Sequence, residues 1–178
     1  MAGRRVAHLA GTSPSNISAY LHGSKRAGRV MRQRLDAIDE LPLSSPYATT
    51  ARLTIPRLAA DVRRYLKEGD RSMALRWVAQ AVQDVRSLSD HRDLAVFFAR
   101  PWSTGSRQWD ALIAGVAERE ARRAGIEAPE WTRSPLFRLR RMWFVTEVEG
   151  LHAYALAHTP PELAIRGVFL DETELESV

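Results

Sequence analysis

The chain of 178 residues contains no cysteine and no long apolar run. Without cysteine it cannot form a disulfide or a thiolate metal site, which fits a cytoplasmic protein. Its longest apolar stretches, such as residues 94–99, are far shorter than the roughly twenty residues that cross a bilayer. The N-terminus also lacks the apolar core of a signal peptide. We therefore expect a soluble protein inside the cell, with no membrane partner.

The motifs of the common enzyme classes are also missing. The chain has no phosphate-binding loop ending in Gly-Lys-Ser or Gly-Lys-Thr, no dinucleotide fingerprint, no His-Glu-x-x-His pair and no nucleophile elbow. Its five histidines are scattered. The cluster of Asp90, His91 and Asp93 favours the start of a helix over a metal site. We expect no catalytic residues, no metal and no cofactor.

Acidic residues are absent from the first 34 positions, which carry seven cations. The rest of the chain sets 19 cations against 21 acidic residues, so the basic charge is confined to one end. Such a segment gains affinity for nucleic acid by displacing counterions from phosphates. A solvated basic face is the alternative. The seven cations are Arg4, Arg5, Lys25, Arg26, Arg29, Arg32 and Arg34.

This basic end has the spacing of two short helices joined by a turn. Gly11 suits the left-handed backbone that ends a helix and starts a tight turn. Ser13 is a preferred N-cap and Pro14 a preferred first helical residue, so a second helix is predicted to begin at Pro14. Apolar residues at intervals of three and four would hold this helix against the module: Ile17, Tyr20 and Leu21.

The strings Leu9-Ala10, Ala10-Gly11-Thr12-Ser13, Ile17-Ser18 and Leu21-His22-Gly23 resemble the XRE, or lambda-repressor-like, helix-turn-helix family. The resemblance implies that residues 14–21 enter the major groove of DNA, while residues at the turn and after it hold phosphates. Carried over by position, the base-facing residues are Pro14, Ser15, Ser18 and Ala19, with Asn16 at the margin. The residues expected to meet the DNA backbone are Thr12, Ser13, Lys25, Arg26 and Arg29.

The chain departs from this family in two ways. The family places another full helix before the pair, whereas only residues 1–5 precede it here, which leaves open a late start, a shortened chain or completion by another segment or subunit. The base-facing side chains also lack the long amides and guanidiniums that make bidentate contacts with bases. We therefore expect thymine methyl contacts, water bridges or DNA shape to supply much of the specificity. A helical pair that does not bind DNA is the alternative.

The overall pattern predicts an all-α fold, with an N-terminal helix-turn-helix module followed by a larger helical domain. A helix over 30–41 would close the module of residues 1–41, and prolines and serines predict a linker over 42–54. Residues 55–178 would form the second domain. Apolar residues recur there at helical spacing, and the first two segments suggest an antiparallel pair; the segments are 55–66, 74–88, 94–98 and 108–124.

Prolines divide the last third, where short helices are predicted over 136–144 and 150–157 and an extended segment over 168–170. Large aromatic residues gather between positions 102 and 143, where a core role is favoured over a partner-binding surface. If Trp143 and Phe144 were consecutive on a helix, one of them could face outward among arginines. The partner-binding candidates are Arg138, Arg141, Trp143 and Phe144. The acidic tail over 171–178 is predicted to be frayed, and binding to a basic partner is the alternative.

The second domain also contains the strings Trp109-Asp110-Ala111-Leu112-Ile113-Ala114-Gly115, Pro129-Glu130-Trp131 and Arg166-Gly167-Val168-Phe169-Leu170-Asp171. They resemble a group of actinobacterial helix-turn-helix proteins, many of which look like antitoxins paired with nucleotidyltransferase-like toxins. The resemblance implies that the helical domain neutralises a toxin encoded nearby and that the N-terminal module represses the promoter of its own operon. We expect the protein to bind operator DNA as a homodimer. A protein-interaction module, or a repressor without a toxin partner, is the alternative.

Overall fold

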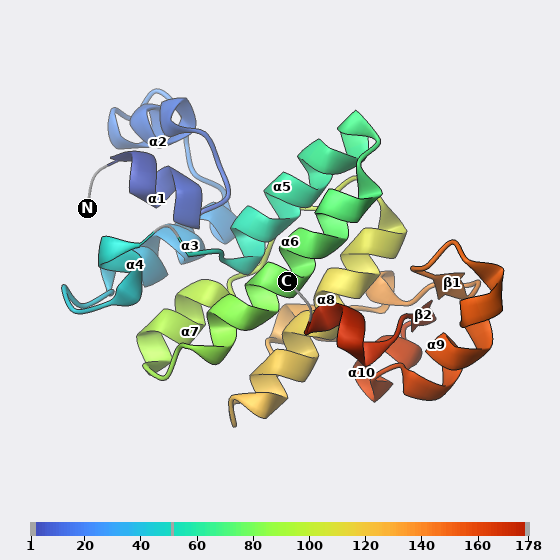
Figure 1. The fold of residues 1–178 in the computed structure, drawn as a ribbon. Coiled ribbons are helices and arrows are strands. Elements are labelled where there is room, and N and C mark those ends of the chain that lie inside the picture. Colours follow the sequence, from blue (N-terminus) through green and yellow to red (C-terminus); the bar gives the residue numbers. More distant parts are fainter. Residues whose placement is uncertain (1–2, 51, 177–178) are drawn as a thin grey trace.

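The structure is a computed structural model that describes residues 3–50 and 52–176. In these residues the fold is all-α, as expected, apart from two strands of two residues each. Helices α1 to α4 lie at one end of the molecule, long helices fill its centre, and short elements cover the other end (Figure 1). No helix of the described part of the chain is long and apolar enough to cross a membrane.

The N-terminal module contains α1 (Gly3–Leu9), α2 (Pro14–Leu21) and α3 (Arg29–Asp39). The predicted turn is confirmed, because Gly11 has a φ of 63°. Ser13 caps α2, its hydroxyl accepting a hydrogen bond of 3.2 Å from the backbone N–H of Asn16. Pro14 is the first residue of α2. The local chemistry of the turn therefore sets where the second helix begins.

The segment expected to be an irregular linker contains a short helix, α4 (Pro46–Thr49). Tyr47 is completely buried, and its hydroxyl donates a hydrogen bond of 3.1 Å to the carbonyl of Leu53. The hydroxyl of Ser45, also buried, donates to the carboxylate of Asp93 at 2.5 Å. The prolines and serines here thus start a helix that packs on the molecule, so the prediction of an irregular segment was wrong for Pro46–Thr49.

The central helices are α5 (Ile55–Glu68), α6 (Arg71–Arg86), α7 (His91–Phe97) and α8 (Arg107–Arg123). The predicted antiparallel pair is α5 and α6, which are joined at Gly69 with a φ of 77° (Figure 1). Helix α8 packs against both and is buried over most of its length. One continuous apolar core extends from Leu9 in the module to Leu175 near the C-terminus.

The N-terminal module is fastened to α5 by close polar and steric contacts. The hydroxyl of Thr54 caps α5 by accepting from the N–H of Arg57, and it donates a hydrogen bond of 2.7 Å to the carbonyl of Leu9. Gly11 lies directly against the backbone of Pro56, where a Cβ would not fit. The module is therefore seated on the first turn of α5.

The last third begins with two 3-10 turns, Glu130–Arg133 and Pro135–Phe137, followed by β1 (Trp143–Phe144). The helix predicted over 136–144 was wrong, because β1 pairs in parallel with β2 (Val168–Phe169). The short helix and the extended segment predicted further on are confirmed as α9 (His152–His158) and β2. A third 3-10 turn, Glu149–Leu151, precedes α9, and α10 (Pro161–Ala164) packs on α8.

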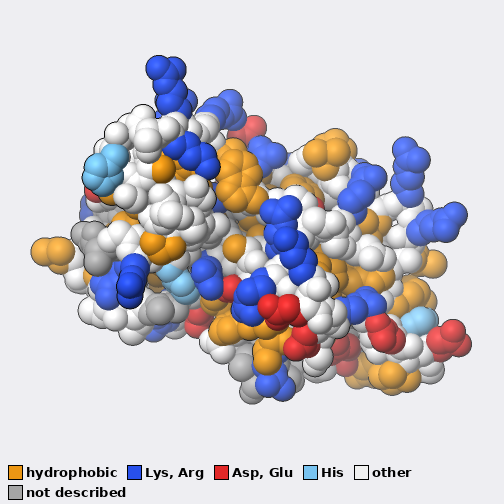
Figure 2. Space-filling view, turned by 90° about the horizontal axis from the view of Figure 1, so that it is seen from above, with side chains coloured by type: hydrophobic (Ala, Val, Ile, Leu, Met, Phe, Trp, Pro, Cys, Tyr) orange, Lys and Arg blue, Asp and Glu red, His pale blue; other side chains and the backbone are white. Residues whose placement is uncertain are grey.

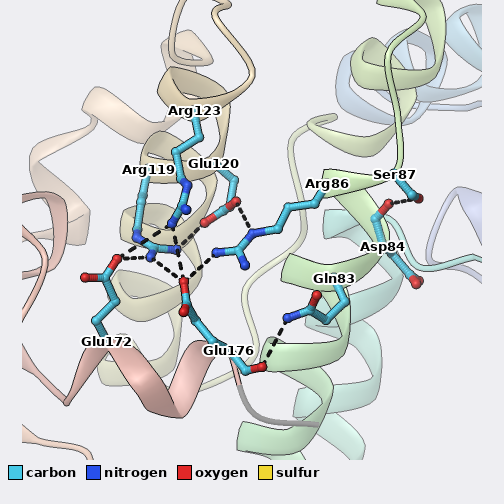
Figure 3. Close-up of polar contacts among 9 residues, drawn as sticks. All are labelled: Gln83, Asp84, Arg86, Ser87, Arg119, Glu120, Arg123, Glu172 and Glu176. Carbon is cyan, nitrogen blue, oxygen red and sulfur yellow. Dashed lines mark hydrogen bonds and ion pairs between the residues drawn. The ribbon is translucent and has the colours of Figure 1, made fainter.

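The acidic tail is docked rather than frayed, as far as Glu176. A last 3-10 turn, Glu172–Leu175, buries Leu175 completely. Glu176 receives a hydrogen bond of 2.9 Å from Arg86, and Glu172 pairs with Arg119, whose side chain is buried (Figure 3). These ion pairs clamp the tail onto α6 and α8, and residues 177–178 lie outside the described part.

Candidate nucleic-acid interface

Helix α2 lies at the edge of the molecule, on the opposite side of α1 from the central helices (Figure 1). Of its eight residues, Ile17 alone is buried. The residues expected to face bases are exposed at Pro14, Ser15 and Ser18 and half-buried at Ala19. The expectation for Leu21 was wrong, since this side chain is 78% exposed and does not hold the helix. The accessible face of α2 is therefore lined by short side chains.

The start of α2 carries a small polar network. The hydroxyls of Ser13 and Ser15 are 2.9 Å apart. Asn16 donates to the hydroxyl of Thr12 at 3.1 Å and accepts from the ammonium of Lys25 at 3.0 Å. Lys25 is thereby held beside the first turn, whose backbone N–H groups favour anions. The structure thus brings together two groups of residues expected to hold phosphates, one that precedes α2 in the sequence and one that follows it.

Three cations lie beside α2. Lys25, Arg26 and Arg29 are exposed, and within the described residues none of them forms an ion pair. The arginines that do form ion pairs all lie at position 57 or later. At the left of Figure 2, over the N-terminal helices, Lys and Arg side chains outnumber acidic ones. This end offers its positive charge to a partner.

Arg34 belongs to the same cluster in the sequence but has a different role. Its side chain is only 1% exposed. The guanidinium donates 2.7 Å and 2.8 Å hydrogen bonds to the carbonyls of Ala10 and Arg100, respectively. Burial lowers the pKa of Arg34 to about 10, so it stays charged at neutral pH. The expectation that Arg34 adds to the basic surface was therefore wrong, because it joins the end of α1 to the central helices.

The partner-binding candidates at the other end of the molecule are not all accessible. Arg138 and Arg141 are exposed. Trp143 is 7% exposed and packs against Trp109, with ring centroids 5.7 Å apart, so it cannot bind a partner as expected. Phe144 is half-buried and stacks on His152 at 4.0 Å. Trp143 lies in strand β1 and not in a helix, and this position places its side chain in the core.

Sequence reasoning missed an apolar surface near these candidates. Large apolar side chains on and around α9 and α10 are exposed to solvent: Val148, Leu151, Leu156 and Ile165. Apolar spacing alone places such residues in the core, and the turns that expose them have no strong local signal.

No family model, curated protein or solved structure matches this chain.

The acidic residues beside His91 act as structural groups. Asp90 caps α7 by accepting a 2.8 Å hydrogen bond from the N–H of Arg92, and Asp93 is buried and accepts from Ser45. Within the described residues, no group of three or more potential metal ligands comes together.

Proposed function

We propose that the protein is a sequence-specific DNA-binding regulator of transcription that places α2 in the major groove. The observation that supports this most is the exposed face of α2 beside three cations that form no ion pair with any described residue. An α-helix fits the major groove of B-form DNA, and short side chains allow its backbone to approach the bases closely. In this proposal Ser15 and Ser18 offer hydroxyls to base edges, while Pro14 and Ala19 contact thymine methyl groups.

Phosphate contacts would position this helix. The residues expected to hold phosphates precede α2 at Thr12 and Ser13 and follow it at Lys25, Arg26 and Arg29. Asn16 joins Thr12 to Lys25 at the first turn of α2, so these groups can meet the DNA backbone beside the start of the helix. Each cation that neutralises a phosphate releases a counterion, which makes the affinity fall as salt rises. DNA shape would supply specificity that the short base-facing side chains cannot.

A two-fold dimer would extend this recognition to an operator. If the protein dimerises, two copies of α2 would read half-sites about one helical turn apart, roughly 34–36 Å. Binding at its own promoter would then block transcription. In this proposal the protein acts in the cytoplasm, and its partners are operator DNA and a second copy of itself.

We further propose, from the sequence resemblance, that the helical body holds a toxin encoded nearby. The exposed apolar side chains around α9, with Arg138 and Arg141, offer a surface for such a partner. This surface and α2 lie at opposite ends of the molecule, so DNA and a protein could bind at once (Figure 1).

A mobility-shift assay with the duplex upstream of the protein's own gene tests the proposal. We expect retention that survives an excess of unrelated duplex. Sequence-blind binding would instead favour a protein-interaction module. The double variant Arg26→Ala/Arg29→Ala should flatten the slope of log affinity against log salt by about 1–2. As a control, Arg76→Ala removes an exposed charge from α6 and should leave the slope unchanged.

The antitoxin part has its own test. Copurification with the product of the adjacent gene, and rescue of cells from that product's toxicity, would support it. A protein that binds its promoter but rescues nothing would be a repressor without a toxin partner.

A further inference from the structure

A second basic feature lies outside α2, in a cleft between α3 and the central body. The cleft has a volume of about 770 Å³. Among the described residues, four arginines from distant parts of the sequence line it, against a single carboxylate, that of Glu130: Arg29, Arg34, Arg100 and Arg133. We call this the α3 cleft. A hollow with this excess of positive charge attracts anions.

The guanidiniums of the α3 cleft are available to a ligand to different degrees. Arg100 is exposed and forms no ion pair among the described residues. Arg133 is exposed and pairs with Glu127 at 2.7 Å, an exposed pair that water weakens. Arg100 and Arg133 can therefore both turn toward an anion in the cleft.

Arg34 supplies the strongest reason to expect a ligand. Its Nε and Nη1 atoms donate to backbone carbonyls, but its buried Nη2 atom has no hydrogen-bond partner among the described residues. The guanidinium lies 4.8 Å from the ring of Trp102, which does not replace a hydrogen-bond acceptor. No carboxylate pairs with Arg34 in the described chain. A buried charge with an unused donor is costly, and an oxyanion nearby would lower that cost.

We propose that the α3 cleft binds a phosphate group, supplied either by a small organic phosphate or by the DNA backbone. Phosphate matches the residues present, because guanidiniums donate paired hydrogen bonds to its oxygens. The cleft has room for a phosphate group and for the molecule that carries it, with Arg34 at its wall and Arg100 and Arg133 at its rim.

Occupation of the cleft would bear on the DNA-binding module. Arg34 holds the carbonyl of Ala10, at the end of α1, and that of Arg100, in the central body. A phosphate in the α3 cleft would thus lie beside the joint between the two parts. If the ligand and DNA prefer different arrangements of that joint, each changes the affinity of the other by the same factor.

Isothermal titration calorimetry of the full chain with pyrophosphate and with ATP, in phosphate-free buffer without divalent cations, tests the binding itself. The variant Arg100→Ala/Arg133→Ala removes two rim charges without touching α2 or the cations that follow it. The control Arg63→Ala/Arg76→Ala removes two exposed arginines that do not line the cleft. We expect saturable binding of one probe per chain, weakened at least about tenfold in the cleft variant and unchanged in the control.

Competition with the promoter duplex identifies the source of the phosphate. A duplex that displaces the probe from the wild type, and binds less tightly to the cleft variant, shows that the DNA backbone fills the cleft. A duplex that leaves the probe bound shows that a free phosphate compound does. Absence of saturable binding by either probe together with unchanged duplex binding by the cleft variant, or equal weakening in both double variants, would overturn the proposal. Probe binding does not require promoter recognition, so the two proposals can fail separately.

Discussion

The substitution Gly11→Ala tests how the turn before α2 is fixed against the body. Gly11 has a φ of 63°, a conformation that costs an alanine about 1–2 kcal/mol. A Cβ there would lie less than 3.0 Å from the carbonyl oxygen of Pro56 and 3.1 Å from the backbone nitrogen of Arg57. These atoms belong to the first turn of α5, so the clash adds about 1–3 kcal/mol. We expect the free energy of unfolding to fall by about 2–5 kcal/mol.

Gly69→Ala is the matched control for this prediction. Gly69 has a φ of 77°, and an added Cβ would meet no atom within 4 Å. Gly69→Ala therefore carries the cost of the left-handed backbone but not that of a clash. The conformational entropy that alanine removes from the unfolded chain is the same in both variants. By differential scanning calorimetry, the melting temperature of Gly11→Ala should lie about 2–12 °C below that of Gly69→Ala. Equal melting temperatures would refute the steric argument and show that the turn can move away from α5.

Two further predictions concern buried charge and the docked tail. Arg34→Met leaves the carbonyls of Ala10 and Arg100 without donors, so the free energy of unfolding measured in urea should fall by about 2–4 kcal/mol. The control Arg32→Met, at an exposed site, should change it by less than about 0.5 kcal/mol. Similar losses in the two variants would contradict the roles assigned to Arg34 and Arg32. The hydrogen bond from Arg86 lowers the pKa of Glu176 below 4.5, so this carboxylate stabilises the fold at neutral pH and loses that effect as pH falls through its folded pKa. The stability gap between the wild type and Glu176→Gln should therefore close in acid, and a gap independent of pH in urea titrations would speak against the tail clamp.

Local chemistry made much of the N-terminal module predictable. Gly11 takes a positive φ, Ser13 caps α2 and Pro14 begins it, as predicted. Each effect depends only on residues a few positions away in the sequence. The long helices α5, α6 and α8 could also be predicted from the sequence, because their apolar spacing extends over many turns.

Contacts between distant residues could not be predicted in this way. Strand β1 exists because Trp143 pairs with Val168, whereas the local spacing of residues predicted a helix for this segment. The tail docks because Glu172 meets Arg119, a partner 53 positions away. The acidic residues of the tail, taken alone, do not indicate which arginine they will meet.

The candidate site shows the same division. Exposure of Ser15 and Ser18 follows from helical periodicity once α2 is placed. Arg34 has the same sequence context as Arg32, yet its partner Arg100 lies 66 positions away, so its burial had no local signal. The α3 cleft was missed for the same reason, since its arginines come from three separate segments.

The affinity of Ser15→Glu for the promoter duplex tests most directly whether α2 contacts DNA. Ser15 is the second residue of α2 and is exposed, so a glutamate there favours the helix dipole and preserves the fold. Ser72→Glu makes the same change at the second position of α6, outside the proposed interface, where Ser72 is also exposed. We predict that Ser15→Glu weakens specific binding at least about tenfold, because its carboxylate faces phosphates and base acceptors. Ser72→Glu should bind like the wild type. Wild-type affinity in a stably folded Ser15→Glu would contradict the proposal that α2 contacts DNA.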